Sequence, residues 1–505
     1  MSIPRLHLVA AAALLAMGFA AHAQPAAPDI DTLTATEAAR QICAGTLSSE
    51  QLVSAYIAQA KAKSNLNAFV TLDKDGAQKV ARTGDEAHRK GGGGASKPVD
   101  GVPVAIKDNI QVKGLPATAG TPALKAFVPA ADAPVVARLR GAGAVILGKT
   151  NMHELAFGVT GYNPAFQTGS EVGVRNAYDP GRIAGGSSSG NGAALGARMA
   201  PASLGTDTGG SVRIPCAFNG CASLRPTMGR YSQAAIAPIS HTRDTAGPMA
   251  LSMADVALLD QVIAGGKPVA PANLKRVRLG VVPAFYANLD ADTRGATDAA
   301  LNKLRAAGVT LVDVDMPKLM DLNGAVGFPV ALYEAYDDMV AYLSKYPTGV
   351  DMTKLAAGIA SPDVKGTFDG LVIPRKLPAA SGVVDARPAY DNAMRVARPQ
   401  LQKLYAQTFA KNRLDALVFP TVPRVALAAT PEASSPENFG ALIQNTDPGS
   451  NAGIPGIQLP SGLGASTGLP VGLELDGPAG SDRKLLAIGL AVHNVVGRVP
   501  GPRTK

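Results

Sequence analysis

Residues 182–225 are dominated by glycine, alanine and serine, and they constrain the fold more than any other part of this 505-residue chain. The stretch opens with "RIAGGSSSGNGAALGARM", in which three adjacent serines are flanked by glycines. Runs of this composition are often flexible linkers. Here, however, residues 190–199 read as a small-residue helix that can pack tightly against a sheet. "ASLG", "TDTGG" and the segment after Ser211 then read as strand, turn and helix start. These elements make a linker a less satisfactory interpretation, although the residues alone leave it open.

Strand and helix patterns alternate over the rest of the chain. Residues 101–109 and 144–148 predict strands around a helix at 133–143, and residues 275–317 predict strand, helix and strand. Residues 320–410 read as mostly helical, and we expect residues 320–450 to shape a pocket, although they contain no readable motif. The pattern predicts an α/β fold: a single large domain, residues 34–505, with a central mixed β-sheet covered by helices.

The N-terminus has the composition of a secretory signal peptide. One early cation, Arg5, precedes an apolar run and the sequence Ala21-His22-Ala23. We expect residues 1–23 to be a signal peptide cleaved after Ala23, and residues 24–33 to form a flexible tail. The mature protein is then periplasmic or secreted.

Composition excludes several classes of protein. The chain is 46% hydrophobic and 17% charged, which is typical of a globular protein. Its net charge of +9 is scattered along the chain, so we expect neither a nucleic-acid partner nor a membrane partner. We expect the protein to be a monomer or a homodimer. Three cysteines cannot build a disulfide framework. Cys216 and Cys221 could pair in an oxidising compartment, but we favour two buried thiols. No spacing of histidine and cysteine indicates a metal.

One motif match is misleading. Gly143, Gly148, Lys149 and Thr150 satisfy the G-x-x-x-x-G-K-T pattern of phosphate-binding loops. The four intervening residues are themselves the predicted strand, so their amides are committed to the sheet and cannot bind phosphate. We therefore predict no nucleotide site.

Lysine is the better candidate for a general base. No G-x-S-x-G motif accompanies His153 or His241, the two histidines that a serine–histidine–acid triad would require. Lys107 ends an apolar strand, and loss of water there lowers the pKa of an amine. A neutral amine near physiological pH can accept a proton from a nucleophile.

Ser211 lies on the glycine-rich turn "TDTGGS". A serine on such a turn is expected to be presented outward, and the neighbouring glycines allow a substrate carbonyl to approach the backbone. The turn's amides then predict an oxyanion hole made by Thr208, Gly209, Gly210 and Ser211.

Taken together, "GVPVAIKD", "GGSSSG" and "GTDTGGSVRIP" resemble the amidase signature family over about residues 35–497. The resemblance implies a Ser-cisSer-Lys triad without a cofactor or a metal. Ser211 would be the nucleophile, Lys107 the base, and Ser187 the bridge between them, with a cis peptide bond to Gly186. The supporting residues would be Gly186, Ser188, Asp207 and Arg213.

Within the family, residues 153–190 and "PISHTRDTAGPM" look most like the indoleacetamide and mandelamide hydrolases. The resemblance implies an amidase that converts a small, aryl-substituted amide to acid and ammonia through an acyl-enzyme, and the signal peptide implies that this amidase is exported. A peptide amidase or aryl acylamidase of the same fold stays open. Outside the enzymes, the alternative is a non-catalytic binding protein, against which Lys107, Ser187 and Ser211 argue.

Overall fold

A computed structural model describes residues 28–90, 97–167 and 172–502 of the chain. Its strands are β1 (Phe69–Leu72), β2 (Pro103–Lys107), β3 (Val145–Thr150), β4 (Ala202–Asp207), β5 (Ala222–Arg225), β6 (Thr245–Ala250), β7 (Arg278–Val281), β8 (Thr310–Asp313), β9 (Lys376–Ala379), β10 (Gly382–Asp385), β11 (Ala416–Pro420), β12 (Gly456–Leu463) and β13 (Pro470–Asp476). Its α-helices are α1 (Ala35–Cys43), α2 (Ser49–Ala62), α3 (Lys74–Arg89), α4 (Pro134–Gly141), α5 (Ser189–Gly196), α6 (Arg213–Asn219), α7 (Met253–Ala264), α8 (Ala291–Ala306), α9 (Leu319–Lys345), α10 (Met352–Ala357), α11 (Pro362–Thr367), α12 (Arg387–Asn392), α13 (Arg398–Asn412), α14 (Pro436–Ile443), α15 (Asp447–Ala452) and α16 (Asp482–Val496).

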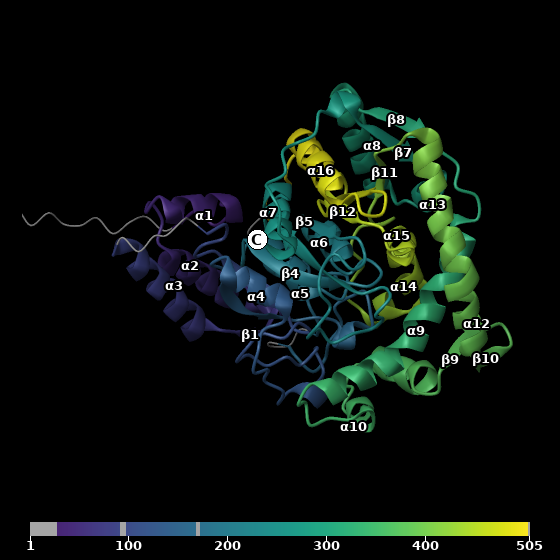
Figure 1. Ribbon diagram of the computed structural model, residues 1–505, viewed down its shortest axis with the longest axis horizontal. Coiled ribbons are helices and arrows are strands. Elements are labelled where there is room, and N and C mark those ends of the chain that lie inside the picture. The colour runs from purple at the N-terminus through teal and green to yellow at the C-terminus, as the bar shows by residue number, and fades with distance from the viewer. Residues whose placement is uncertain (1–27, 91–96, 168–171, 503–505) are drawn as a thin grey trace, which may run out of the picture.

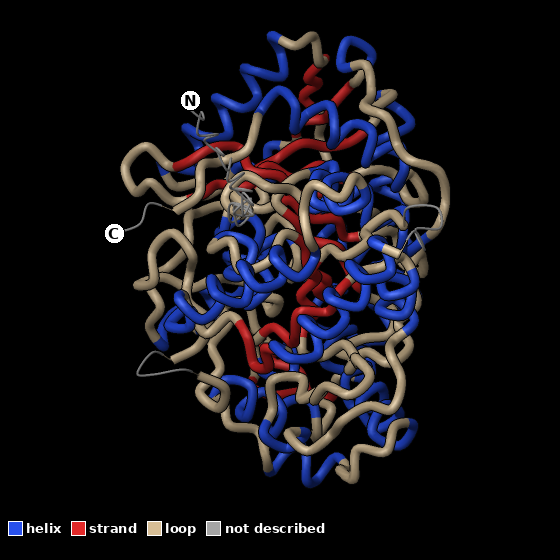
Figure 2. The backbone as a smooth tube through the Cα atoms, turned by 90° about the vertical axis from the view of Figure 1, so that its left-hand side faces the viewer, coloured by secondary structure: helices blue, strands red, loops and turns tan. Residues whose placement is uncertain are grey.

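One large mixed sheet organises the molecule. Its strand order is β1-β3-β2-β4-β6-β5-β12-β13-β11-β7-β8. The β3-β2-β4 pairs and the β11-β7-β8 pairs are parallel, and the strands between these two groups pair antiparallel. The strands run through the middle of the molecule with helices on either side (Figure 2). The predicted single domain with a helix-covered mixed sheet is therefore confirmed.

Helices cover both faces of the sheet, so its central strands are buried on both sides. β2, β4, β6, β11 and β13 are buried along their whole length. In Figure 1, α1–α3 lie at one end of the molecule, whereas α9, α12 and α13 lie along the opposite side. The segment 320–410 is mostly helical as predicted, apart from the β9–β10 hairpin.

The small-residue segment packs as a unit beside the sheet. Every residue of α5 and of α6 is buried, as is every residue of β4. A side chain at Gly192 of α5 would place its Cβ 2.7 Å from Pro215 of α6, so glycine allows the two helices to touch. The segment is a packed unit and not a linker.

The prediction that Cys216 and Cys221 are separate thiols is wrong, because they form a disulfide. Gly220 ends α6 in the left-handed conformation, with φ +70°, and turns the chain back toward the helix. The two Cα atoms are thereby brought to 4.5 Å.

The predicted signal peptide, residues 1–23, lies outside the described residues, as do residues 24–27 of the predicted tail. Residues 30–32 form a turn, and Leu33, which follows it, is buried in the core. Among the described residues, no helix combines the length and apolar character needed to cross a bilayer.

Candidate active site

Three segments that are distant in sequence meet at one edge of the sheet. β2 and β4 are parallel neighbours, with Ile106 opposite Leu204, so their carboxyl ends lie together. Lys107 is the last residue of β2, and Ser211 lies on the turn between β4 and α6. Ser187 lies in the loop that enters α5. The fold therefore brings together the three residues singled out in the sequence.

Lys107 is fully buried and contacts neutral hydroxyls. Its Nζ donates to Ser187 Oγ at 2.8 Å and to Thr206 Oγ1 at 2.8 Å. Burial lowers the pKa of Lys107 to about 7, although the more distant carboxylates of Asp207 and Asp244 oppose the shift. A substantial fraction of this amine is therefore neutral near pH 7 and able to accept a proton.

The link between the two serines differs from the one expected. The described chain contains no cis peptide bond, so the Gly186–Ser187 bond is trans, which corrects the cis bond implied by the family resemblance. Gly185 and Gly186 adopt φ values of +83° and +63°, and these two left-handed residues turn the chain into the serine run. As a result the Ser187 backbone N–H, not its hydroxyl, donates to Ser211 Oγ, at 3.1 Å.

Asp207 organises the turn that carries Ser211. Its carboxylate accepts hydrogen bonds from the amides of Gly210 at 2.9 Å and Val212 at 3.1 Å. The Gly210 amide is thus occupied, which corrects the expectation that it serves the oxyanion hole. Among the described residues, the amides of Thr208, Gly209 and Ser211 donate no hydrogen bond within the chain. Three of the four predicted donors remain available to a ligand.

The two glycines of the turn make room for protein rather than only for substrate. A Cβ at Gly210 would lie 2.3 Å from Thr446 Oγ1, and a Cβ at Gly209 would lie 2.9 Å from Asp447 Oδ1. Thr446 also donates to the Gly209 carbonyl at 2.6 Å. The start of α15 therefore covers this face of the turn, and Ser211 is 7% exposed instead of standing outward.

Buried polar groups support the turn from below. Arg213 donates to both carboxylate oxygens of Asp207, each at 3.1 Å, and Arg225 donates to the same carboxylate at 2.9 Å. Burial alone would raise the pKa of Asp207, but the two guanidinium groups outweigh it and hold that pKa below its ordinary value. Ser188 Oγ donates to the Thr206 carbonyl at 3.0 Å and so ties the serine loop to β4.

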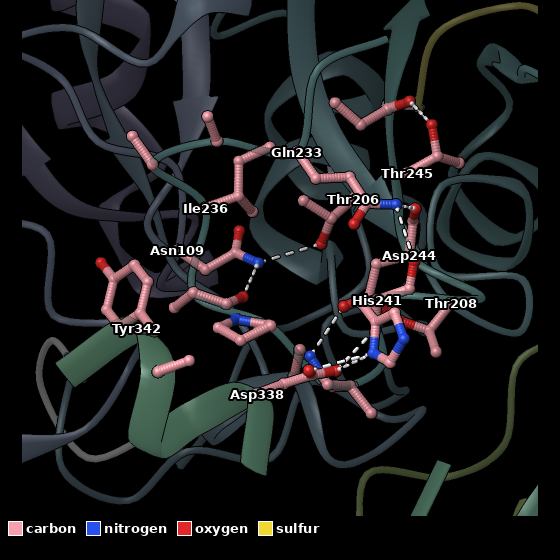
Figure 3. Close-up of a pocket in the computed structure, with 18 of the residues that line it drawn as sticks. Asn109, Thr206, Thr208, Gln233, Ile236, His241, Asp244, Thr245, Asp338 and Tyr342 are labelled. Carbon is pink, nitrogen blue, oxygen red and sulfur yellow. Dashed lines mark hydrogen bonds and ion pairs between the residues drawn. The ribbon is translucent and has the colours of Figure 1, made fainter. Parts of the chain in front are cut away.

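A cavity of about 280 Å³ adjoins this cluster at Thr206 and Thr208 (Figure 3). Its walls come from Asn109, from the loop 233–246 and from the end of α9, including Asp338 and Tyr342. Several of the lining residues are apolar: Ala156, Ala234, Ala235, Ile236, Ala237, Pro238, Ile239, Ala246 and Ala341. The contribution of α9 agrees with the expectation that residues 320–450 shape a pocket. The contribution of residues 233–246 to the cavity was not predicted, because "PISHTRDTAGPM" in this region was noted only for its likeness to the two hydrolases.

His241, Glu334 and Asp338 meet near this cavity with side-chain atoms within 4.8 Å of one another. Their contacts are internal. His241 Nδ1 lies 3.0 Å from Asp338, and Glu334 accepts hydrogen bonds from Ser240, Thr242 and Tyr390. These contacts fasten the loop 240–244 to α9. Sequence patterns do not reveal this group, because Glu334 and Asp338 are about a hundred residues from His241 along the chain.

Comparison with known proteins agrees with this geometry. The Amidase family model matches residues 51–486. The chain is 47% identical to mandelamide hydrolase from Pseudomonas putida, covering 93% of this chain and 92% of that protein. It is 40% identical to indoleacetamide hydrolase from Agrobacterium vitis, over 88% and 93% of the two chains. The solved structure of native peptide amidase from Stenotrophomonas maltophilia superposes with a TM-score of 0.77 at 28% identity, covering 94% of this chain and 99% of that one. The chain therefore belongs to the amidase signature family and is an amidase, a hydrolase of amide C–N bonds.

Proposed function

We propose that this amidase hydrolyses a small, aryl-substituted primary amide to the carboxylic acid and ammonia. The single observation that carries the chemistry is Lys107, a fully buried amine whose hydrogen-bond partners are the hydroxyls of Ser187 and Thr206. The substrate class rests on the relatives, since mandelamide and indoleacetamide are both primary amides that carry an aromatic ring.

In the proposed reaction Ser211 is the nucleophile and Ser187 is the proton relay. Ser211 Oγ attacks the amide carbon while its proton passes through Ser187 to neutral Lys107. The tetrahedral intermediate carries its negative charge on the former carbonyl oxygen, beside the amides of Thr208, Gly209 and Ser211. The proton then returns to the amide nitrogen, the C–N bond breaks and ammonia leaves. Water hydrolyses the remaining ester by the same route in reverse.

Ser187 is the best candidate for the proton relay because it contacts both Lys107 and Ser211. Its hydroxyl accepts from Lys107, and its backbone N–H reaches Ser211 Oγ. Thr206 also accepts from Lys107 but has no such contact with Ser211. Relay through Ser187 requires its hydroxyl to approach Ser211 when substrate is bound.

The cavity beside Thr206 suits an aromatic ring, because most of its wall is apolar. We propose that the aryl group of the substrate binds there. Replacing Ala341, which lines the cavity, by Phe should raise KM for aryl amides more than KM for a short aliphatic amide. Equal effects on both amides would place the aryl group elsewhere.

The function is tested by measuring ammonia release from mandelamide, indoleacetamide, propionamide and a peptide with a C-terminal amide. We expect turnover of the aryl amides, and none by the Ser211→Ala variant. Preference for the peptide amide would favour the alternative function suggested by the fold likeness to peptide amidase. No product from any amide would indicate a binding protein.

The nucleophile is tested separately by labelling with a fluorophosphonate. Trypsin cleaves after Arg182, Arg198 and Arg213, so the serine run and the proposed nucleophile fall in different peptides. We expect the label on the peptide 199–213, at Ser211 and not at Ser203. Label on the peptide 183–198 would reverse the roles of the two serines.

We further propose that the protein is exported and cleaved after Ala23. Expression of the full chain in a bacterium, followed by cell fractionation and mass analysis of the amino terminus, tests this. Export predicts a periplasmic product that begins at Gln24. A cytoplasmic product that keeps residues 1–23 would contradict it.

A further inference from the structure

Two carboxyl groups, Glu474 and Asp476, lie side by side in the core below the active site. They are two residues apart on β13, so their side chains project from the same face of the sheet. Both are fully buried. Arg213 donates to Glu474 Oε1, whereas no N–H or hydroxyl of a described residue donates to Glu474 Oε2 or to either carboxyl oxygen of Asp476. The pair therefore lacks the donors that two buried carboxylates would need.

The charges around the pair balance only if it keeps one proton. Asp207 of β4, Arg213 of α6 and Arg225 of β5 join the pair in one fully buried cluster. With every group ionised, three carboxylates face two guanidinium groups, which leaves one uncompensated negative charge out of contact with water. One proton on the pair makes the cluster neutral.

The remaining neighbours do not supply a countercharge. Tyr405 of α13 has a buried hydroxyl without a partner among the described residues, and burial together with the acid pair raises its pKa, so it stays neutral. Asp447 of α15 already pairs with Arg243. Burial raises the pKa of Asp476 to about 6 and raises that of Glu474 well above its ordinary value, against the opposing effect of Arg213. A proton on either carboxyl supplies the hydroxyl donor that the pair otherwise lacks.

Two glycines make room for the Asp476 carboxyl. A Cβ at Gly449 of α15 would lie 2.3 Å from Asp476 Oδ2. A Cβ at Gly456, which lies opposite Asp476 in the β12–β13 register, would lie 2.5 Å from Oδ1. The carboxyl therefore fills a closely fitted space and has little freedom to move away from Glu474.

A continuous path of hydrogen bonds leads from the pair to the nucleophile. Glu474 accepts from Arg213, Arg213 donates to Asp207, and Asp207 accepts the amides of Gly210 and Val212 on either side of Ser211. We propose that Glu474 and Asp476 share one proton and act through Arg213 as positioning residues for the turn that carries Ser211. The inference rests on the proposed role of Ser211 as nucleophile.

Loss of the shared proton at alkaline pH adds a negative charge beside Arg213. Arg213 is the cation in contact with the pair, so its bonds shift toward Glu474 at the expense of those to Asp207. The turn then loses its order, and kcat falls while KM changes little. The proposal therefore predicts a fall in kcat at high pH that does not come from Lys107, whose deprotonation raises activity.

The test compares kcat and KM against pH for the wild type, Glu474→Gln, Asp476→Asn and the double variant. Either single variant keeps one carboxylate and makes the cluster neutral without a proton. We expect both single variants to lose the alkaline fall, with kcat at neutral pH reduced less than about tenfold, the equivalent of one pKa unit. The double variant leaves one uncompensated positive charge, so we expect it to lose more than about tenfold.

The matched control is Asp255→Asn. Asp255 is another fully buried carboxyl with a raised pKa, but it bonds to Thr36 and Ser252, away from Arg213. This variant should keep the alkaline fall. An alkaline fall that persists in both single variants of the pair would overturn the proposal.

The shared proton can also be detected by measurements that do not depend on catalysis. A pair whose folded pKa is raised stabilises the protein at low pH and loses that contribution as pH rises. Tm should therefore fall with rising pH above about pH 4, the unfolded carboxyl range, and fall less steeply in Asp476→Asn. Difference infrared spectra at neutral pH should show a protonated carboxylic acid that disappears in either single variant. If the infrared band is present but no amide is hydrolysed, the proposed function fails and the shared proton stands.

Discussion

Two buried lysines on neighbouring strands of this protein have different hydrogen-bond partners. Lys107 on β2 and Lys149 on β3 are both fully buried. Ile106 lies opposite Lys149 in the parallel register, so the two lysines project from opposite faces of the sheet. Lys149 Nζ contacts the Asp108 carboxylate at 3.3 Å and the carbonyls of Asp108 and Pro116. Lys107 Nζ contacts two hydroxyls.

Direct contact with a carboxylate distinguishes the environment of Lys149 from that of Lys107, the proposed base. Burial lowers the pKa of both amines, but at Lys149 an ion pair in direct contact opposes the effect. At Lys107 the opposing carboxylates do not touch the amine, and its pKa falls to about 7. In the proposed mechanism the general base therefore arises by burial of an amine without a contacting counter-ion.

Replacing Lys107, the proposed base, should reduce activity more than any other change predicted below. Lys107→Ala and Lys107→Met should each lower kcat/KM for a primary amide by roughly 10³-fold, within the usual contribution of a general base. Fold retention is checked by circular dichroism and Tm. Near-normal turnover at neutral pH in either variant would remove Lys107 from the mechanism.

Removing the structural amine should act on stability instead. Lys149→Met leaves the buried Asp108 carboxylate without its cation, which costs about 3–5 kcal/mol for a buried pair. Denaturant unfolding measures this loss, and the double variant Lys149→Met/Asp108→Asn should recover part of it. If Lys149→Met is stable but loses as much turnover as the Lys107 variants, Lys149 does not have a purely structural role.

The third prediction gives Lys107 the counter-ion that it lacks. In Thr206→Asp a carboxylate replaces the hydroxyl that now accepts from Nζ at 2.8 Å, so the pKa of Lys107 should rise. The acid limb of kcat/KM, expected near pH 7 in the wild type, should move upward by at least about one pH unit, which lowers activity at pH 7 by about fivefold or more.

Thr206→Val is the matched control, because it removes the same hydroxyl without adding charge. Its acid limb should not move upward. An acid limb at the same pH in Thr206→Asp and in the wild type would mean that a group other than Lys107 titrates there.

Sequence reasoning reached the residues that local motifs mark. Lys107, Ser187 and Ser211 each lie in a short segment of recognisable composition, and the alternation of strands and helices indicated the mixed sheet. The hydrogen bond from the Gly210 amide to Asp207 was not predicted, because it depends on where the Asp207 side chain points after folding. The trans peptide before Ser187 and the disulfide of Cys216 depend in the same way on local backbone angles that a residue pattern does not specify.

Long-range contacts were the other gap. The cavity joins Asn109, the loop 233–246 and α9, which are separated by more than a hundred residues in places. The acid pair did leave a usable signal. In "PVGLELDG" a strand of otherwise apolar residues carries carboxyls two positions apart, and this spacing puts both on one face. A strand buried on both faces, however, is recognised only in the folded protein.

Treatment with EDTA should leave kcat and KM unchanged. The lysine comparison accounts for a base at neutral pH through burial alone, so the proposed reaction needs no metal-bound water. In the described part of the chain, the residues that come nearest to a metal site are His241, Glu334 and Asp338, whose donor atoms are already engaged with one another or with neighbouring hydroxyls and amides. Activity is measured after dialysis against EDTA and again after Zn²⁺ or Mg²⁺ is added. Loss of activity that a divalent ion restores would contradict this account, and the His241→Ala variant would then show whether the cluster binds the ion.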